Sequence, residues 1–132
     1  VNRVTKALNQ EGKSLHGSRI LILGLAYKSN IDDTRESPSF ALIELLALEG
    51  ALIDFYDPHI NTIPKIRKHP KLEGKKSVNW GKEVIAGYDL VLISTAHDAV
   101  NFDDLGRWAN IIVDTRNAMA SVAESNAKVY AA

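Results

Sequence analysis

Cationic and hydroxyl side chains gather in the segment that follows a short apolar run ending at Gly24. Lys28 and Arg35 lie in this segment, and Ser37 opens the helix expected after it. Lysine meets a phosphate as a point charge, whereas arginine can form two parallel hydrogen bonds with one. The unpaired N–H groups at the start of a helix also attract anions. These residues suit a phosphate site. A solvated surface loop with local charge pairs is the alternative that they leave open.

Polar residues also follow two other apolar runs. His97 and Asp98 come shortly after the run that ends at Ser94, and Arg116 follows the run that ends at Asp114. Arg116 could contact an anionic ligand, or it could be a surface arginine paired with Asp114. For His97, a role in capping its own loop is as well supported as contact with a ligand.

Asp57 ends a further apolar run and precedes Pro58. In dinucleotide-binding folds an acid near this position binds the ribose, after a turn with the pattern G-x-G-x-x-G. The segment that begins at Gly24 has one glycine where that turn needs three. We therefore favour a turn-forming role for Asp57.

The composition excludes several classes of function. The 132 residues contain 16 basic and 16 acidic side chains and no cysteine. The balanced charge gives no reason to expect nucleic acid or an anionic membrane as partner. Thiol catalysis, disulfides and cysteine-ligated zinc are ruled out within the chain. The four histidines lack metal-site spacing, so no metal is expected, and no apolar run reaches the roughly 18 residues that cross a bilayer. We expect a cytoplasmic protein.

Apolar runs alternate with helical patterns along the chain, which favours an open parallel sheet. This predicts an α/β fold with three layers and Rossmann-like topology, but without the dinucleotide glycine fingerprint. Ligands of such sheets bind outside the carboxyl ends of the strands. The expected strands are 19–24, 51–56, 89–94, 111–114 and 128–130, with a short edge strand at Val78. The expected helices are 37–49, 81–86 and 102–109.

Residues 1–17 are expected to be the end of a linker helix from an upstream part of a longer protein. The chain starts at Val1 without an initiator methionine, and a lone helix of this length is marginal in water. Residues 18–132 would then form the single remaining domain.

Five segments together resemble the C-terminal domain of the UDP-glucose/GDP-mannose dehydrogenase family. They occur in the family's order and at similar spacing, and the resemblance covers roughly residues 14–130. The segments are Gly24-Leu-Ala-Tyr-Lys28, Asp32-Asp-Thr-Arg-Glu-Ser-Pro38, Tyr56-Asp-Pro58, Ile93-Ser-Thr-Ala-His97 and Val113-Asp-Thr-Arg-Asn117.

The resemblance implies an NAD-dependent oxidation of the C6 alcohol of a nucleotide sugar to a carboxylate. Members of the family use two NAD molecules in succession and a cysteine that forms covalent intermediates. Their N-terminal domain binds NAD, a central helix supports a homodimer, and the C-terminal domain binds UDP. The implied partners are therefore a UDP-sugar and the protein's own N-terminal and central domains. The implied cofactor, NAD, would be bound mainly outside this chain.

The resemblance assigns roles to four residues. Tyr27 and Lys28 match an aromatic-lysine pair that contacts the UDP-sugar, with tyrosine where many members have phenylalanine. Arg116 matches a second arginine that contacts substrate, and Arg35 matches an arginine that reaches toward NAD. No catalytic residue is expected here, since the cysteine and its helpers would lie upstream. We expect the isolated chain to bind a UDP-sugar weakly or not at all and to oxidise nothing.

Two other hypotheses stay open. The chain could be a stand-alone flavodoxin-like binding or regulatory module, although Asp57 and Lys128 are poorly placed for a receiver domain. It could also be a small Rossmann enzyme with its own NAD, against which the missing glycine fingerprint argues. Within the family, the motif wording is most like the branch of UDP-N-acetylglucosamine 6-dehydrogenases. UDP-N-acetylmannosamine and UDP-glucose are further candidates.

Overall fold

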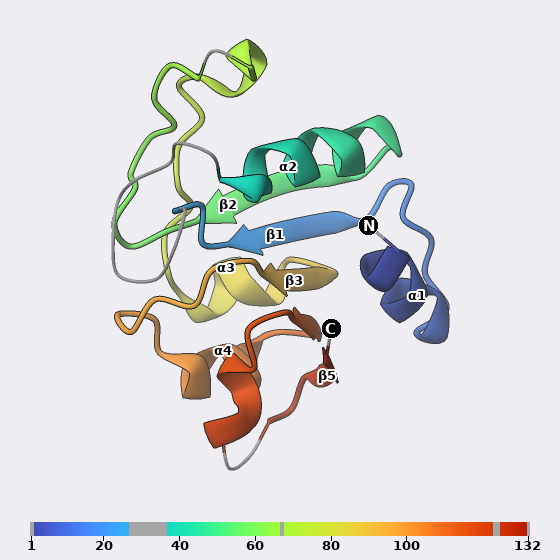
Figure 1. Cartoon of the computed structure of the whole chain (residues 1–132). Coiled ribbons are helices and arrows are strands. Elements are labelled where there is room, and N and C mark those ends of the chain that lie inside the picture. Colours follow the sequence, from blue (N-terminus) through green and yellow to red (C-terminus); the bar gives the residue numbers. More distant parts are fainter. Residues whose placement is uncertain (1, 27–36, 67, 123–124, 132) are drawn as a thin grey trace.

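A computed structural model of the chain describes residues 2–26, 37–66, 68–122 and 125–131. Five strands form one sheet in the order β2-β1-β3-β4-β5, and every neighbouring pair is parallel (Figure 1). The strands are β1 (Arg19–Leu23), β2 (Leu52–Tyr56), β3 (Leu90–Ile93), β4 (Ile111–Asp114) and β5 (Lys128–Ala131). The predicted α/β fold with a parallel sheet is confirmed.

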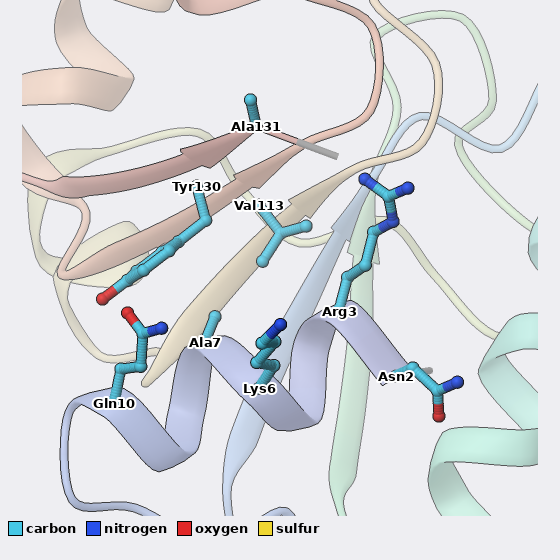
Figure 2. Close-up of a pocket in the computed structure, with 8 residues that line it drawn as sticks. All are labelled: Asn2, Arg3, Lys6, Ala7, Gln10, Val113, Tyr130 and Ala131. Carbon is cyan, nitrogen blue, oxygen red and sulfur yellow. The ribbon is translucent and has the colours of Figure 1, made fainter.

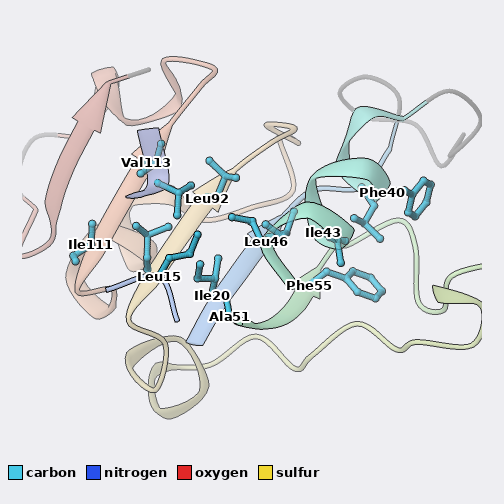
Figure 3. Packing of buried hydrophobic residues seen from close by; sticks show 14 of the residues in the cluster. Leu15, Ile20, Phe40, Ile43, Leu46, Ala51, Phe55, Leu92, Ile111 and Val113 are labelled. Carbon is cyan, nitrogen blue, oxygen red and sulfur yellow. The ribbon is translucent and has the colours of Figure 1, made fainter. Parts of the chain in front are cut away.

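Helices cover both faces of the sheet, which gives the three predicted layers. They are α1 (Asn2–Gln10), α2 (Pro38–Leu48), α3 (Lys82–Ala86) and α4 (Phe102–Trp108), with short 3-10 turns η1 (Pro70–Leu72) and η2 (Ala118–Ser121). Alternate residues of β1 enter the two cores. Ile20 and Ile22 pack with α1 and α2, whereas Leu21 and Leu23 pack with α3 and α4. Figure 3 shows part of the first of these cores, which includes Ile20 of β1 and Leu46 of α2. A strand that is buried on both faces is typical of a central parallel strand.

α1 packs on the same sheet as the rest of the chain. It buries Val4, Ala7 and Leu8 in the core that also contains Ile111 and Val113 of β4. The helix ends at Gln10, so it is shorter than the predicted segment 1–17. The predicted domain division at residue 17 stays a prediction.

α2 begins as its sequence predicts. Ser37 caps the helix, because its Oγ accepts the N–H of Ser39, and Pro38 occupies the first turn. The helix buries Phe40, Ile43 and Leu46, but Leu48 on the outer side is 84% exposed. Although its sequence is apolar on nearly all sides, only one face of the helix meets the sheet.

The segment between β2 and α3 is largely irregular. Val78 does not form the predicted edge strand, because its contact with β2 is a single hydrogen bond from its N–H to the Phe55 carbonyl. The two tryptophans, Trp80 and Trp108, are packing residues. The Trp80 ring lies 4.9 Å from Tyr56 and 5.9 Å from Trp108. Within the described ranges, no helix combines the length and apolar character that a membrane span requires.

Candidate functional site

Buried polar side chains gather at the carboxyl edge, the edge of the sheet formed by the last residues of the strands and the segments that follow them. Of the eight buried polar residues described, only Ser18 lies at the opposite edge. The other seven are Ser37, Ser39, Asp57, Ser94, Thr95, His97 and Asp114. Every buried side-chain nitrogen or oxygen in the described part of the chain has a hydrogen-bond partner. Such groups are costly to bury unpaired, and here their hydrogen bonds to one another and to the backbone fix the segments that form this edge.

Gly24 lets the end of β1 approach the segment after β3. Its φ is +90°, and a Cβ at this position would lie 2.3 Å from the carbonyl oxygen of Thr95. Its N–H donates to the Tyr56 carbonyl at 2.9 Å. The space that the missing side chain leaves is therefore filled by protein backbone. In a dinucleotide site, a glycine would leave that space for the pyrophosphate.

Asp57 joins the ends of β1 and β2. Its Oδ2 accepts the N–H groups of Leu25 at 2.7 Å and Ala26 at 3.3 Å, and its Oδ1 accepts the N–H of His59 at 2.8 Å. The bond to His59 confirms the predicted turn-forming role. The alternative role in ribose binding is wrong, because the carboxylate is buried and both of its oxygens serve the protein.

His97 lies beside Asp57 in the interior. Its Nε2 is 2.9 Å from Asp57 Oδ2, and both side chains are 0% exposed. The His59 ring meets the His97 ring edge-on, with the ring centres 4.6 Å apart. The structure thus favours the loop-capping interpretation of His97 over contact with a ligand.

Two hydroxyl residues connect the end of β3 to its neighbours. Thr95 Oγ1 donates to the Ala26 carbonyl at 2.9 Å. The hydroxyls of Ser94 and Ser39 are 2.6 Å apart, and Ser39 Oγ also donates to the Gly24 carbonyl at 3.3 Å. The start of α2 is therefore tied to both β1 and β3.

Arg116 lies in the turn after β4, and Asp114 shapes this turn. Asp114 Oδ1 accepts the N–H groups of Arg116 at 3.0 Å and Ala118 at 3.1 Å, while its Oδ2 accepts that of Met119 at 2.8 Å. The Nε–H of Arg116 donates to the Ser94 carbonyl at 2.9 Å. A guanidinium carries four further N–H donors, and this side chain is exposed. The turn therefore presents a positioned cation at the carboxyl edge.

Arg116 borders an open cavity of about 500 Å³, together with Asp114, Thr115, Asn117 and Ala131. Ala131 also borders a second cavity of about 350 Å³ between α1 and the ends of β4 and β5. Figure 2 shows Arg3 and Lys6 of α1 extending along this second cavity toward β4. The hollowed surface beside the strand ends is therefore rich in positive charge.

Burial and a nearby charge alter the acidity of one phenol at this edge. Desolvation, followed by the negative charge of Asp57, raises the pKa of Tyr56 above its ordinary value. Tyr56 therefore stays neutral at physiological pH and serves as a packing residue against Trp80.

The structure tests only part of the predicted site. Arg116 lies at the predicted edge, whereas Tyr27, Lys28 and Arg35 fall outside the described residues. The described residues contain no group of three or more histidine, cysteine, aspartate or glutamate side chains that could hold a metal ion.

The sequence analysis missed the role of Asp114, which it considered only as the ion-pair partner of Arg116 in one of two alternatives. The structure shows that its carboxylate accepts backbone N–H groups instead. An aspartate that directly follows an apolar run and precedes a turn is a signal that could have indicated this role.

Comparison with known proteins identifies the family. Residues 21–121 match the UDP-binding domain of the UDP-glucose/GDP-mannose dehydrogenase family, a range that runs from β1 to η2 and includes every buried polar group of the carboxyl edge. The chain belongs to this family. The resemblance stated from the motifs is therefore confirmed, and the carboxyl edge is part of a UDP-binding domain.

Named relatives in the family are dehydrogenases of nucleotide sugars. The chain is 32% identical over 124 residues to a UDP-N-acetyl-D-mannosamine dehydrogenase of Methanococcus maripaludis, covering 88% of this chain and 26% of the relative. It is 38% identical over 92 residues to a UDP-glucose 6-dehydrogenase of Bacillus subtilis, covering 70% and 20% respectively. The structure of the UDP-D-ManNAc dehydrogenase of Pyrococcus horikoshii superposes with a TM-score of 0.72 at 25% identity, over 97% of this chain and 29% of that one. The chain thus spans less than a third of the length of these relatives.

Proposed function

We propose that the chain is the UDP-binding part of an NAD-dependent UDP-sugar 6-dehydrogenase. The match of residues 21–121 to the family's UDP-binding domain is the single observation that carries this proposal. The whole enzyme would oxidise the C6 alcohol of the sugar to a carboxylate. The chain itself would hold the nucleotide end of the substrate.

Arg116 is the proposed contact that the structure describes. Asp114 fixes the turn that carries it, and the Ser94 carbonyl holds its Nε–H. The remaining donors of the guanidinium suit the paired oxygens of a diphosphate. The adjoining cavities supply space for a ligand at the edge where parallel sheets bind their ligands.

Three further residues complete the proposed site. Tyr27 and Lys28 would contact the UDP-sugar, and Arg35 would reach toward NAD, as their places in the family motifs suggest. Tyr27 and Lys28 directly follow Ala26, whose backbone is held by Asp57 and Thr95.

NAD itself is proposed to bind mainly outside this chain. Gly24 is the single glycine at the place of the dinucleotide turn, and its open side faces the backbone of Thr95. The chain also contains no cysteine, so the thiol of the proposed reaction must be supplied by residues outside these 132. The chain would therefore work with an N-terminal and a central domain. The whole enzyme is proposed to be a cytoplasmic homodimer, as the family resemblance implies, and to serve polysaccharide biosynthesis.

An N-acetylated hexosamine is the proposed sugar. The wording of the motifs favours this branch, and relatives named UDP-N-acetyl-D-mannosamine dehydrogenase are 26–33% identical to the chain. UDP-N-acetylglucosamine and UDP-N-acetylmannosamine are both candidates, and a 33% identical UDP-glucose 6-dehydrogenase of Rhizobium meliloti keeps UDP-glucose as the second choice.

A titration followed by amide chemical shifts tests the proposal, because it detects even weak binding. The ligands are UDP, the three UDP-sugars and NAD. UDP and the UDP-sugars are expected to shift the signals of Arg116 and Ala26 weakly and saturably, whereas NAD leaves them unchanged. Binding of NAD alone would support a small Rossmann enzyme. No response to UDP or to any of the UDP-sugars would contradict the proposal that this chain holds the nucleotide end of the substrate.

A further inference from the structure

The segment Ser94–His97, directly after β3, contacts three parts of the proposed nucleotide site. The Ser94 carbonyl accepts the Nε–H of Arg116 at 2.9 Å, and Thr95 Oγ1 donates to the Ala26 carbonyl at 2.9 Å. His97 Nε2 lies 2.9 Å from Asp57 Oδ2, the oxygen that accepts the N–H groups of Leu25 and Ala26. One short segment thus connects the turn after β4 with the end of β1.

The Asp57–His97 contact is the buried end of this connection. Backbone N–H groups can only donate, so Asp57 acts as an acceptor at both oxygens. The arrangement therefore favours a proton on His97 Nε2 that is donated to Oδ2. Both side chains are 0% exposed, and a hydrogen bond to a buried carboxylate is among the stronger ones in proteins. The loss of this bond would leave the carboxylate short of one donor in the interior.

We propose that Asp57 and His97 form a positioning pair for UDP. The pair holds the Leu25–Ala26 backbone, and it anchors the segment whose Ser94 carbonyl orients Arg116. Neither side chain touches the ligand, because both are buried. The identity of the ligand rests on the proposed function, whereas the ordering of the backbone by the pair does not. The pair lowers the conformational freedom of the site, which UDP would otherwise have to remove on binding.

Three variants of the chain test the pair. His97→Leu removes the donor, whereas His97→Gln places an amide N–H near the position of Nε2. Tyr88→Phe is the matched control, since it also removes one hydrogen bond of a buried side chain, between the Tyr88 hydroxyl and Asp54 Oδ2 at 2.7 Å. Tyr88 precedes β3 and therefore lies at the opposite edge of the sheet.

The first readout requires no ligand. Amide hydrogen exchange at Leu25 and Ala26 should be about tenfold faster in His97→Leu, and the Arg116 Nε–H signal should shift. His97→Gln should recover most of the protection, and Tyr88→Phe should leave these signals unchanged. Wild-type exchange at Leu25 and Ala26 in His97→Leu would overturn the proposal.

The second readout is the affinity for UDP, measured from the same amide signals. His97→Leu should weaken binding about tenfold, with most of the loss restored in His97→Gln and none in Tyr88→Phe. An equal loss in His97→Leu and Tyr88→Phe would reduce the pair to a general stabilising contact and overturn its positioning role. If His97→Leu does not fold, His97→Gln and Asp57→Asn are compared with wild type by the same two readouts.

The two proposals can fail separately. If wild-type chain shows no response to UDP, the proposed function fails for this chain while the exchange data still decide whether the pair holds the backbone. If UDP binds but His97→Leu binds it with wild-type affinity, the positioning proposal fails and the proposed function stands.

Discussion

The two edges of the sheet use the same residue types in opposite ways. At the carboxyl edge, Asp57 is 0% exposed and accepts backbone N–H groups from two separate segments. At the amino edge, where the strands begin, Asp89 is 32% exposed and pairs with Lys13 at 3.2 Å. Both aspartates accept hydrogen bonds, but only the carboxyl-edge network is removed from water.

The difference supports the carboxyl edge as the proposed ligand site. An exposed ion pair adds from nothing to about 1 kcal/mol and tolerates change. A buried network fixes the backbone around it, and a fixed backbone can present groups such as Arg116 to a ligand with less loss of entropy. The amino edge therefore contributes modest stability, whereas the carboxyl edge fixes the positions of the backbone and of groups such as Arg116. Substitutions in matched pairs can test this contrast.

Gly24 and Gly17 give the pair with the largest expected difference. They flank β1 at its carboxyl and amino ends, with φ of +90° and +83°, but a Cβ at Gly24 meets Thr95 whereas one at Gly17 meets nothing within 4 Å. Gly17→Ala should cost about 1–2 kcal/mol for the left-handed backbone alone. Gly24→Ala should cost roughly 2–5 kcal/mol, because the steric overlap is added. Urea unfolding measures both values, and equal costs would contradict the close approach at Gly24.

Asp114 and Asp89 give the next pair. Asp114→Asn should lower the free energy of unfolding by about 2–3 kcal/mol, because its amide would face a backbone N–H in a buried turn. Asp89→Asn, at the exposed edge, should cost less than about 1 kcal/mol. Thermal or urea unfolding compares the two variants. A larger loss in Asp89→Asn would reverse the contrast between the edges.

Acid titration should show the smallest effect, at Asp89. The N–H of Arg19, followed by the Lys13 ammonium, lowers the pKa of this carboxyl below its ordinary value despite some opposing burial. A lowered pKa means that the folded chain binds fewer protons than the unfolded chain. The resulting stabilisation is present above about pH 4 and is lost as the pH falls through the folded pKa. Between pH 5 and pH 3, the free energy of unfolding of Asp89→Asn should therefore fall less than that of wild type. Urea unfolding at each pH measures this, and the same fall in both proteins would count against the contribution of Asp89.

Much of the fold could be predicted because its signals are local. Apolar runs such as 19–24 and 89–94 indicate buried parallel strands, and Ser37-Pro38 marks the start of α2. The exposed side of α2 at Leu48 could not be predicted, since an apolar helix does not reveal which of its sides lacks a partner.

The site divides in the same way. The turn formed by Asp57 could be predicted from the proline that follows, but its contact with His97 joins residues 40 positions apart and depends on the order of the strands. The proposed ligand contact of Arg116 depends on the family motif, because its residue type and place also fit a surface arginine. Asp114, in the same motif, shapes the turn that carries Arg116.

The affinity for UDP of Arg116→Ala compared with Arg19→Ala tests the central claim most directly. Arg116 extends from the carboxyl edge, whereas Arg19 begins β1 at the amino edge and lies over the Tyr88 ring at 4.9 Å. If the carboxyl edge is the UDP site, Arg116→Ala should weaken UDP binding tenfold or more, a loss of about 1.4 kcal/mol of binding free energy, while Arg19→Ala should bind UDP like wild type. Unchanged affinity in Arg116→Ala, or an equal loss in both variants, would contradict it.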